Sequence, residues 1–247
     1  GQPGKCSFTL IPDDVLKIEE GNAVRLDVNG TPVFFGFIFE RGWGSEGLVK
    51  VTAYDQLRYL KNKKSYNYTG LTAGEVIRMI AGDFHLQTGE LADTGWMLER
   101  NEKNSTLFDV ILNALDLTMI RTGKIYVLYD DVGKLTLKNV EDMKLDIVID
   151  ETTAQDYDFK ISIDSSTYNQ IRVYCENNNT NAREVYMTKD TENINKWGIL
   201  QYDESIDSGA DGQNIAETYL KFYNQPSKSL NIKDAFGDVR VRAGCLI

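Results

Sequence analysis

The only histidine, His85, is the first residue to consider for chemistry, because imidazole changes its charge near neutral pH and is a common metal ligand. It directly follows a predicted helix that ends at Phe84. An imidazole at a helix C-terminus is favoured by the helix dipole without any catalytic role. The cysteines, Cys6, Cys175 and Cys245, form no CxxC pair, and no Gly-x-Ser-x-Gly motif is present. These residues therefore predict no catalytic group.

Two further segments match ligand-binding patterns only in part. Residues Gly42–Gly47 fit Gly-x-Gly-x-x-Gly, but the residues that follow, Leu48–Tyr54, read as a strand. The dinucleotide-binding loop requires a helix at that place, so we expect a hairpin loop. Asp207–Gly212 faintly resembles a calcium loop, yet Gly209 and Thr218 stand where oxygen ligands are needed. The sequence therefore predicts no cofactor and no metal site.

Paired carboxylates need separate consideration, because two of them are enough for a glycosidase. The chain contains 37 Asp and Glu residues, so such a pair is available in principle. The neighbouring acids Asp130 and Asp131, and the pair Glu90 and Asp93, are better explained by turns. The acidic residues thus neither exclude a glycosidase nor select its site.

Charge and hydrophobicity limit the partners of the chain. Its net charge is −10, which gives no attraction for phosphate backbones or anionic lipid, and the basic stretch Arg58–Tyr66 is typical of a solvated face. The apolar stretch Val28–Phe39 is broken by Gly30 and Pro32 and is too short to span a membrane. Without a signal peptide or a disulfide framework, the chain is expected to be made in a reducing compartment. We expect no membrane and no specific nucleic acid as partner.

A hairpin is the clearest structural signal in the first sixty residues. Asn29-Gly30 suits a type I′ turn, in which both central residues have positive φ, and alternating apolar residues flank it. A regular two-residue loop predicts three cross-strand pairs, namely Val28 with Thr31, Leu26 with Val33, and Val24 with Phe35.

The second face of this hairpin is the candidate interaction site. With the expected register it carries Arg25 and Asp27 together with the apolar residues Phe34 and Ile38. One interpretation is partial cover by a neighbouring loop, since scattered exposed apolar residues are common. The other is a contact with another subunit, which we assign to Phe34 and Ile38.

Helical signals mark the middle of the chain. Thr72 and Glu75 form a capping box, and Thr106 with Asp109 opens a second helix that stops near Gly123. A hairpin follows, and the last hundred residues return to strand patterns with one helix at about residues 213–224. The expected division is 1–62, mostly strands; 63–143, a small α+β unit; and 144–247, strands with one helix. Both outer parts are expected to be incomplete at their ends.

Several stretches taken together resemble the XkdQ/YqbQ family of phage-like elements and contractile bacteriocins. No single stretch is a chemical motif, but the set in this order is specific and extends over nearly the whole chain. They are Val49–Leu60, Ala81–Gly95, Ala114–Lys124 with Tyr129–Asp131, Arg183–Asp190 with Lys196–Gln201, and Val241–Cys245.

The resemblance implies a structural hub protein of a tail baseplate rather than an enzyme. Its fold would be α+β and mainly β, with two tail-tube-like β-barrel domains flanking the small α+β domain. The hub would be a homotrimer that adapts the sixfold tail tube to the threefold spike. The implied partners are further copies of the chain, the tail tube protein, the spike protein, baseplate wedge proteins and LysM-type tail proteins. The protein would be assembled in the bacterial cytoplasm and reside in the baseplate of a phage tail or phage-tail-like particle.

Two other functions stay open at this point. Some relatives of this kind are labelled cell-wall hydrolases, so the chain is alternatively a peptidoglycan hydrolase or the carrier domain of one on the tail tip. It shows no peptidase triad or metal set to support this. A carbohydrate-binding β-module would use exposed aromatic residues, for which Trp43, Trp96 and Trp197 are the candidates.

Overall fold

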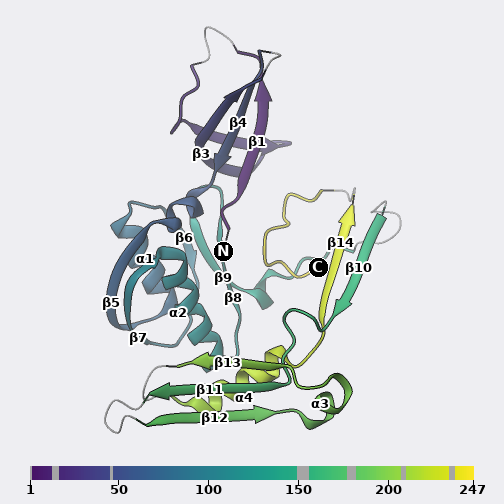
Figure 1. Cartoon of the computed structure of the whole chain (residues 1–247). Helices are drawn as coiled ribbons and strands as arrows, with labels where there is room; N and C mark the ends of the chain where they lie inside the picture. The colour runs from purple at the N-terminus through teal and green to yellow at the C-terminus, as the bar shows by residue number, and fades with distance from the viewer. Residues whose placement is uncertain are drawn as a thin grey trace. The chain divides into compact units, whose positions relative to one another are not determined.

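A computed structural model describes residues 2–12, 17–44, 47–148, 156–176, 182–206, 210–233 and 237–247. The chain divides into two compact units. The first comprises Gly1–Ile147 with Gly237–Ile247, and the second comprises Val148–Phe236. Both are mixed α+β structures in which strands predominate (Figure 1).

The first unit begins with an antiparallel four-stranded sheet in the order β1-β4-β3-β2. Its strands are β1 (Lys5–Leu10), β2 (Ala23–Val28), β3 (Thr31–Trp43) and β4 (Val49–Tyr54). β1 and β2 lie at opposite edges and do not pair with each other among the described residues, so the sheet is a half-barrel. The closed barrel expected for residues 1–62 is therefore not found in the described part of the chain.

The turn between β2 and β3 confirms the expected hairpin. Asn29 has φ 50° and Gly30 has φ 81°, and Val28 pairs with Thr31. Positive φ at both central residues is the requirement of a type I′ turn, which Asn-Gly satisfies at little cost.

The register beyond the turn differs from the prediction. A β-bulge lies next to the Leu26–Asp27 step and gives β3 an extra residue. As a result, Leu26 lies opposite Phe34 instead of Val33, and Val24 lies opposite Gly36 instead of Phe35. Because side chains alternate along a strand, this one-residue shift exchanges the two faces of β3.

The α+β body of the first unit follows the sheet through the 3-10 helix η1 (Gln56–Lys61). It contains two helices and two small sheets, of which one pairs β5 with β7 and the other has the order β6-β9-β8. The elements are β5 (Lys63–Leu71), α1 (Ala73–Asp83), β6 (Thr88–Leu91), β7 (Leu98–Thr106), α2 (Leu107–Thr122), β8 (Tyr126–Asp130), β9 (Leu135–Asn139) and the 3-10 helix η2 (Val140–Met143).

Both helices of the body begin as their sequences predict. The Thr72 side chain accepts a hydrogen bond from the backbone N–H of Glu75, whose carboxylate in turn accepts from the Thr72 N–H, which completes the capping box. Thr106 caps α2 in a similar way, and Gly123 ends it with φ 68°. The helices bury a continuous apolar core against the strands. Its fully buried members include Leu60, Ile77, Ile80, Leu107, Ile111, Leu135 and Leu137.

Residues 237–247 return to the first unit. Leu246 forms a parallel bridge with Lys144, and the backbone of Gly244 approaches the Val127 side chain so closely that a Cβ there would lie 2.7 Å from it. Apart from this bridge, the segment consists of turns and irregular backbone.

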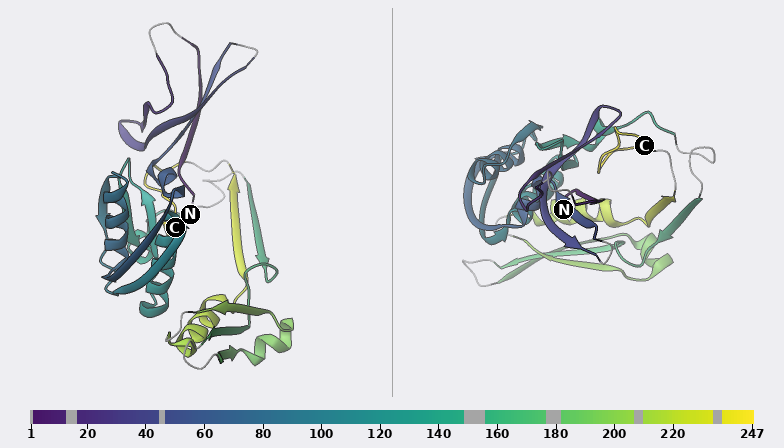
Figure 2. Two further views of the ribbon diagram at one scale, coloured as in Figure 1. Left: turned by 60° about the vertical axis from the view of Figure 1, so that its left-hand side comes forward. Right: turned by 90° about the horizontal axis from the view of Figure 1, so that it is seen from above.

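The second unit contains a two-stranded ribbon and a three-stranded sheet. The ribbon pairs β10 (Asp156–Ser162) with β14 (Ser227–Lys233), and the sheet has the order β12-β11-β13. The sheet strands are β11 (Gln170–Glu176), β12 (Arg183–Lys189) and β13 (Gln201–Ser205), and the helices are α3 (Thr191–Trp197) and α4 (Gly212–Tyr223). α4 lies along one face of the sheet (Figure 2).

These sheets stay separate among the described residues, so a second β-barrel is not shown. The strand patterns from residue 156 onwards correspond to β10–β14 with small shifts, whereas the strand expected at 145–149 is not found over the described residues 145–148. α4 confirms the expected helix at about 213–224. Residues 177–181 and the start of the calcium-like segment at Asp207 lie outside the described residues.

Candidate interaction surfaces

One face of the β10–β14 ribbon is mostly apolar, with Lys228 opposite Ile161 as its charged residue, and the other face is polar. Tyr157, Phe159 and Ile161 alternate along β10, and Leu230 of β14 lies directly opposite Phe159. All four side chains are more than half exposed, at 67%, 52%, 56% and 53%. We call this set the ribbon face.

The other side of the ribbon is polar. It carries Asp156, Asp158 and Lys160 on β10, and an ion pair joins Lys233 to Asp156 with an N–O distance of 2.9 Å. This alternation of apolar and polar side chains is typical of a strand with one buried face, although no described residue of this chain covers the apolar face.

An uncovered apolar ribbon is not a stable arrangement by itself. Isolated two-stranded ribbons are marginal in water, and contiguous exposed apolar residues mark contact sites. Each strand of the ribbon pairs only with the other in the described structure, so one backbone edge of each is also available. The ribbon thus has both an apolar face and free strand edges for a partner.

The three-stranded sheet repeats this pattern. Its inner face buries Ile171, Val173 and Cys175 beneath α4. The contact is close, because a Cβ on Gly212 of α4 would lie 2.2 Å from the Tyr186 ring of β12. One face of the sheet is therefore a small complete core.

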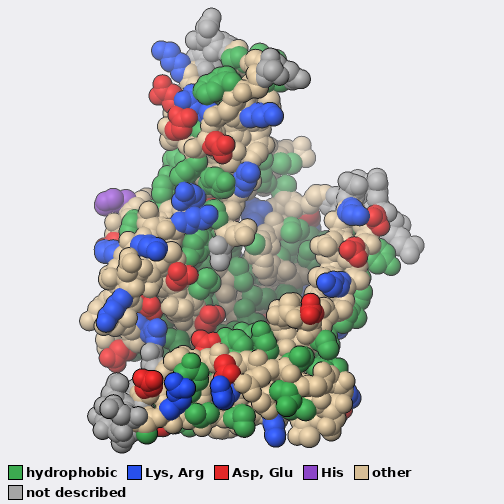
Figure 3. All heavy atoms as spheres, in the orientation of Figure 1, with side chains coloured by type: hydrophobic (Ala, Val, Ile, Leu, Met, Phe, Trp, Pro, Cys, Tyr) green, Lys and Arg blue, Asp and Glu red, His purple; other side chains and the backbone are tan. Residues whose placement is uncertain are grey.

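The opposite face of the sheet is open. Val185 and Met187 of β12 are 52% and 53% exposed, and Tyr174 lies directly opposite Val185. The Arg183 guanidinium stacks 4.7 Å from the centre of the Tyr174 ring, and Arg172 pairs with Asp203. Figure 3 shows hydrophobic side chains between basic and acidic ones over this sheet. Apolar residues rimmed by paired charges are typical of protein interfaces.

The predicted interface residues Phe34 and Ile38 lie elsewhere than expected. Ile38 is only 4% exposed and packs with Val49 and Val51 in the core of its own sheet. Phe34 is partly buried on the same side, with its ring against Gly36. The bulge in the hairpin is the reason, since it turns these residues inward. Their contact with another subunit stays a prediction, but Ile38 is not accessible while this sheet is folded.

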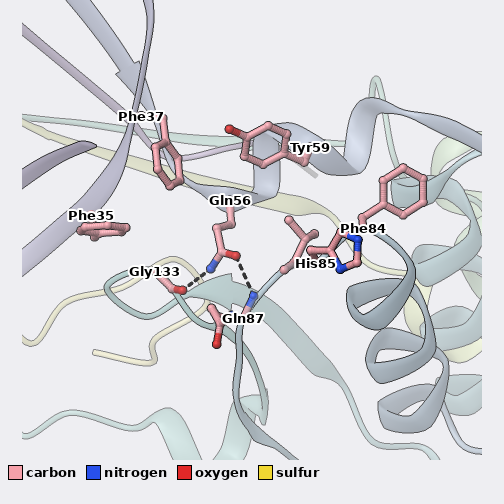
Figure 4. A pocket seen from close by; sticks show the side chains of 9 residues that line it. Phe35, Phe37, Gln56, Tyr59, Phe84, His85, Gln87 and Gly133 are labelled. Carbon is pink, nitrogen blue, oxygen red and sulfur yellow. Dashed lines mark hydrogen bonds between the residues drawn. The ribbon is translucent and has the colours of Figure 1, made fainter. Parts of the chain in front are cut away.

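His85 lies at the surface, where it is the single purple side chain in Figure 3. Its backbone has φ 55°, directly after the C-terminus of α1. It borders a hollow of about 350 Å³ whose walls include Phe35, Phe37, Tyr59 and Phe84 (Figure 4). The lining provides no carboxylate and no cysteine beside the imidazole, so its geometry does not resemble an acid–base site.

One further site, which no sequence motif indicates, lies beside this hollow. Asp55 is 6% exposed, and its side chain accepts hydrogen bonds from the N–H groups of Gly4 and Leu57 at 2.8 and 3.0 Å. Burial, and secondly the nearby Asp130 charge, raise the pKa of Asp55 to about 7. The only local signal was an Asp at a helix start, which is the ordinary capping role.

The described residues of the glycine-rich motif bring no ligand-binding groups together. The glycine-rich segment at 42–47 joins β3 to β4, as expected for a hairpin loop, with Ser45 and Glu46 outside the described residues. No cluster of three or more His, Cys, Asp or Glu side chains suited to a metal occurs in the described ranges. The described helices include none with the length and apolar character needed to cross a membrane.

The three tryptophans stand on separate elements. Trp43 ends β3 beneath the Arg41 guanidinium, Trp96 lies between β6 and β7, and Trp197 ends α3. The Trp43 side chain is 66% exposed and that of Trp96 39%. This arrangement gives no specific support to a sugar-binding aromatic platform.

Comparison with known proteins identifies relatives along the whole chain. The profile of a family described as YQBQ-like matches residues 1–247. The chain is 32% identical over 235 residues to the phage-like element PBSX protein XkdQ of Bacillus subtilis (strain 168), an alignment that covers 92% of this chain and 71% of the relative. It is also 32% identical over 206 residues to the protein YqbQ of the same organism, covering 81% of this chain and 61% of YqbQ.

Solved structures share the fold at low sequence identity. The prophage tail protein gp18 from Listeria monocytogenes EGD-e matches with a TM-score of 0.60 and 13% identity, over 92% of this chain and 70% of gp18. The 43 kDa tail protein of prophage MuSo2 from Shewanella oneidensis matches with a TM-score of 0.61 and 11% identity, over 89% of this chain and 68% of that protein. In each case the chain spans only part of the relative.

Proposed function

Because this chain belongs to the YqbQ-like family, we propose that it is a structural component of a phage or phage-like tail and forms the hub of the baseplate. Its sequence relative XkdQ is a protein of a phage-like element, and its fold is shared with prophage tail proteins. These relatives are consistent with a protein that is not an enzyme. The hub would join the sixfold tail tube to the threefold spike.

The observation that carries this proposal is the uncovered apolar surface of the second unit. The ribbon face and the open side of the β11–β13 sheet offer contact area rather than reactive groups. Burying one large apolar side chain contributes about 1.5–3 kcal/mol, so a few such residues can hold a neighbour firmly. A protein that transmits force between tube and spike needs contacts of this kind.

The ribbon face is assigned to a neighbouring copy of the same chain. In a closed ring of three, each copy presents one patch to a different, complementary patch of the next copy, and no copy is left with an uncovered patch. The free edges of β10 and β14 add backbone hydrogen bonding to the apolar contact, as in strand addition. The tail tube, spike, wedge and LysM-type proteins would then bind the assembled trimer.

The acidic composition suits a channel protein. With a net charge of −10, the chain repels rather than retains passing DNA. In a bacteriocin, which carries no DNA, this property would have no role.

The decisive test compares two double variants of the same pair of strands. In the whole protein, Phe159→Ser with Leu230→Ser removes a directly opposed pair from the ribbon face, whereas Asp158→Ser with Asn231→Ser changes the adjacent opposed pair on the polar face. Sedimentation velocity measures self-association, circular dichroism measures folding, and particle purification measures incorporation.

We expect the apolar variant to remain folded but to lose self-association and incorporation. The polar variant should assemble as the unmodified protein does. Normal assembly of the apolar variant would contradict the assignment of the ribbon face, and absence of the unmodified protein from tail particles would contradict the tail function itself.

A further inference from the structure

A buried acidic residue, Asp55, and a partly buried one, Asp130, lie where the N-terminal sheet joins the α+β body. Asp55 follows the last residue of β4 and caps η1, and Asp130 is the last residue of β8. Asp55 is 6% exposed, and the Asp130 charge contributes to its electrostatic environment. No described function of the tail uses this pair, so it requires its own explanation.

The hydrogen bonds of the pair connect separate segments. Asp55 binds the segment before β1 in both directions, because its carboxylate accepts from the Gly4 N–H and its own N–H donates to the Gly4 carbonyl at 3.1 Å. Asp130 accepts from the N–H of Gly133 at 2.7 Å. Its second oxygen, Oδ2, is buried and has no hydrogen-bond partner among the described residues.

Gln56 completes the junction. Its side-chain amide donates to the Gly133 carbonyl, and its Oε1 accepts from the Gln87 N–H at 2.8 Å (Figure 4). The Phe35 ring of β3 lies against Gly133, where an added Cβ would come within 2.6 Å of it. The two carboxyl groups are therefore located at the contact that fixes the sheet on the body.

The electrostatics favour a proton at this junction near neutral pH. Burial is the main cause that raises the pKa of Asp55, and burial likewise raises the pKa of Asp130. The charged groups near the two carboxyl groups are acidic. The Asp130 charge raises the pKa of Asp55, and the Asp131 charge raises the pKa of Asp130. The opposing influences are hydrogen bonds from Gly4, Gln56, Leu57 and Gly133 rather than a cation.

We propose that Asp55 and Asp130 form a proton-dependent latch between the N-terminal sheet and the α+β body. With one proton on the pair, a single negative charge remains and the junction is closed. When both carboxyl groups are ionised, the two negative charges repel each other and their burial away from water becomes unfavourable. The contact between the sheet and the body then loosens.

The direction of the pH effect follows from linkage. Since the folded junction raises the pKa of Asp55 from 3.8 to about 7, the closed state binds more protons than the open one. Its extra stability is fully present below pH 3.8 and is lost as the pH rises through about 7. This inference does not depend on the proposed tail function.

The test is an NMR titration of the whole chain between pH 4 and pH 9. The amide protons of Gly4 and Leu57 report on the Asp55 carboxylate, and that of Gly133 reports on Asp130, because each donates directly to it. We expect a common midpoint near pH 7 for the Gly4 and Leu57 signals. Amide exchange at Leu57 and Gly133, corrected for its intrinsic pH dependence, should accelerate as the pH rises from 3.8 and level off above about 7, because the closed state loses its extra stability in that range.

Asp130→Asn and Asp131→Asn provide the matched comparison. Removing the Asp130 charge should lower the midpoint by about one pH unit or more and flatten the change in exchange rate. Asp131 is an exposed acid in the same turn, and its substitution should leave the Asp55 midpoint nearly unchanged. A midpoint near pH 4 in the unmodified chain overturns the proposal, whether or not the variants fold. A midpoint unaffected by Asp130→Asn overturns the coupling of the pair.

Discussion

The α+β body and the second unit use the same sequence patterns with different outcomes. In the body, α1, α2 and the strands enclose one apolar core, so that Leu60, Ile77 and Leu107 are fully buried. In the second unit, α4 covers one face of a sheet, while Val185, Met187 and the ribbon face stay exposed. Alternation of apolar and polar residues therefore shows that a face needs cover, but not whether the cover comes from the same chain.

The largest effect expected from this difference concerns stability. Ile77→Ala in the body should lower the free energy of unfolding by about 2–5 kcal/mol, because it leaves a cavity in a closed core. Ile161→Ala on the ribbon face should change it by no more than about 0.5 kcal/mol, since that side chain is 56% exposed. Urea unfolding of the dilute chain measures both. Equal losses would show that the ribbon face is covered within the chain.

The next prediction compares the loss of stability on substituting Ile38 and Phe34, the two residues expected at the interface. Ile38→Ala should destabilise the N-terminal sheet by about 2–4 kcal/mol, because Ile38 belongs to its core. Phe34→Ser should cost less, as Phe34 is only partly buried. Thermal unfolding of the single variants distinguishes them. If Ile38→Ala left stability unchanged and prevented assembly, Ile38 would be an interface residue after all.

The smallest effect compares helix caps in the two regions. Thr72 takes part in a reciprocal capping box, whereas Asp211 caps α4 through one hydrogen bond to the Asn214 N–H at 3.2 Å. Thr72→Ala should lower the free energy of unfolding by about 1 kcal/mol, and Asp211→Ala by less. Thr72→Ser is the control and should retain most of the stability. A larger loss at Asp211 would contradict this ranking.

Local structure could be read from the sequence where neighbouring residues decide it. The type I′ turn at Asn29-Gly30 and the helix starts at Thr72 and Thr106 depend on few residues and are confirmed. The bulge near Leu26 was not predicted, because the Asn29-Gly30 turn does not specify an extra residue in β3. α3 was also missed, since this short helix buries none of its residues and has no apolar pattern.

The sites depend on contacts that a sequence pattern does not contain. Gln56 and Gly133 are 77 positions apart, and only the fold brings them together with Asp55 and Asp130. The ribbon pairs strands from opposite ends of the second unit, so the sequence indicated the strands but not their joint apolar face. The resemblance supplied the family, while the closed barrels that it implied are not present among the described residues.

The most direct test of the account is a density map of the intact tail particle. The account predicts a trimer of this protein at the end of the tail tube, with Tyr157, Phe159, Ile161 and Leu230 of each copy buried against a neighbouring copy. A map in which the protein is absent from the tail end, or in which these side chains face solvent in the assembled particle, would contradict it.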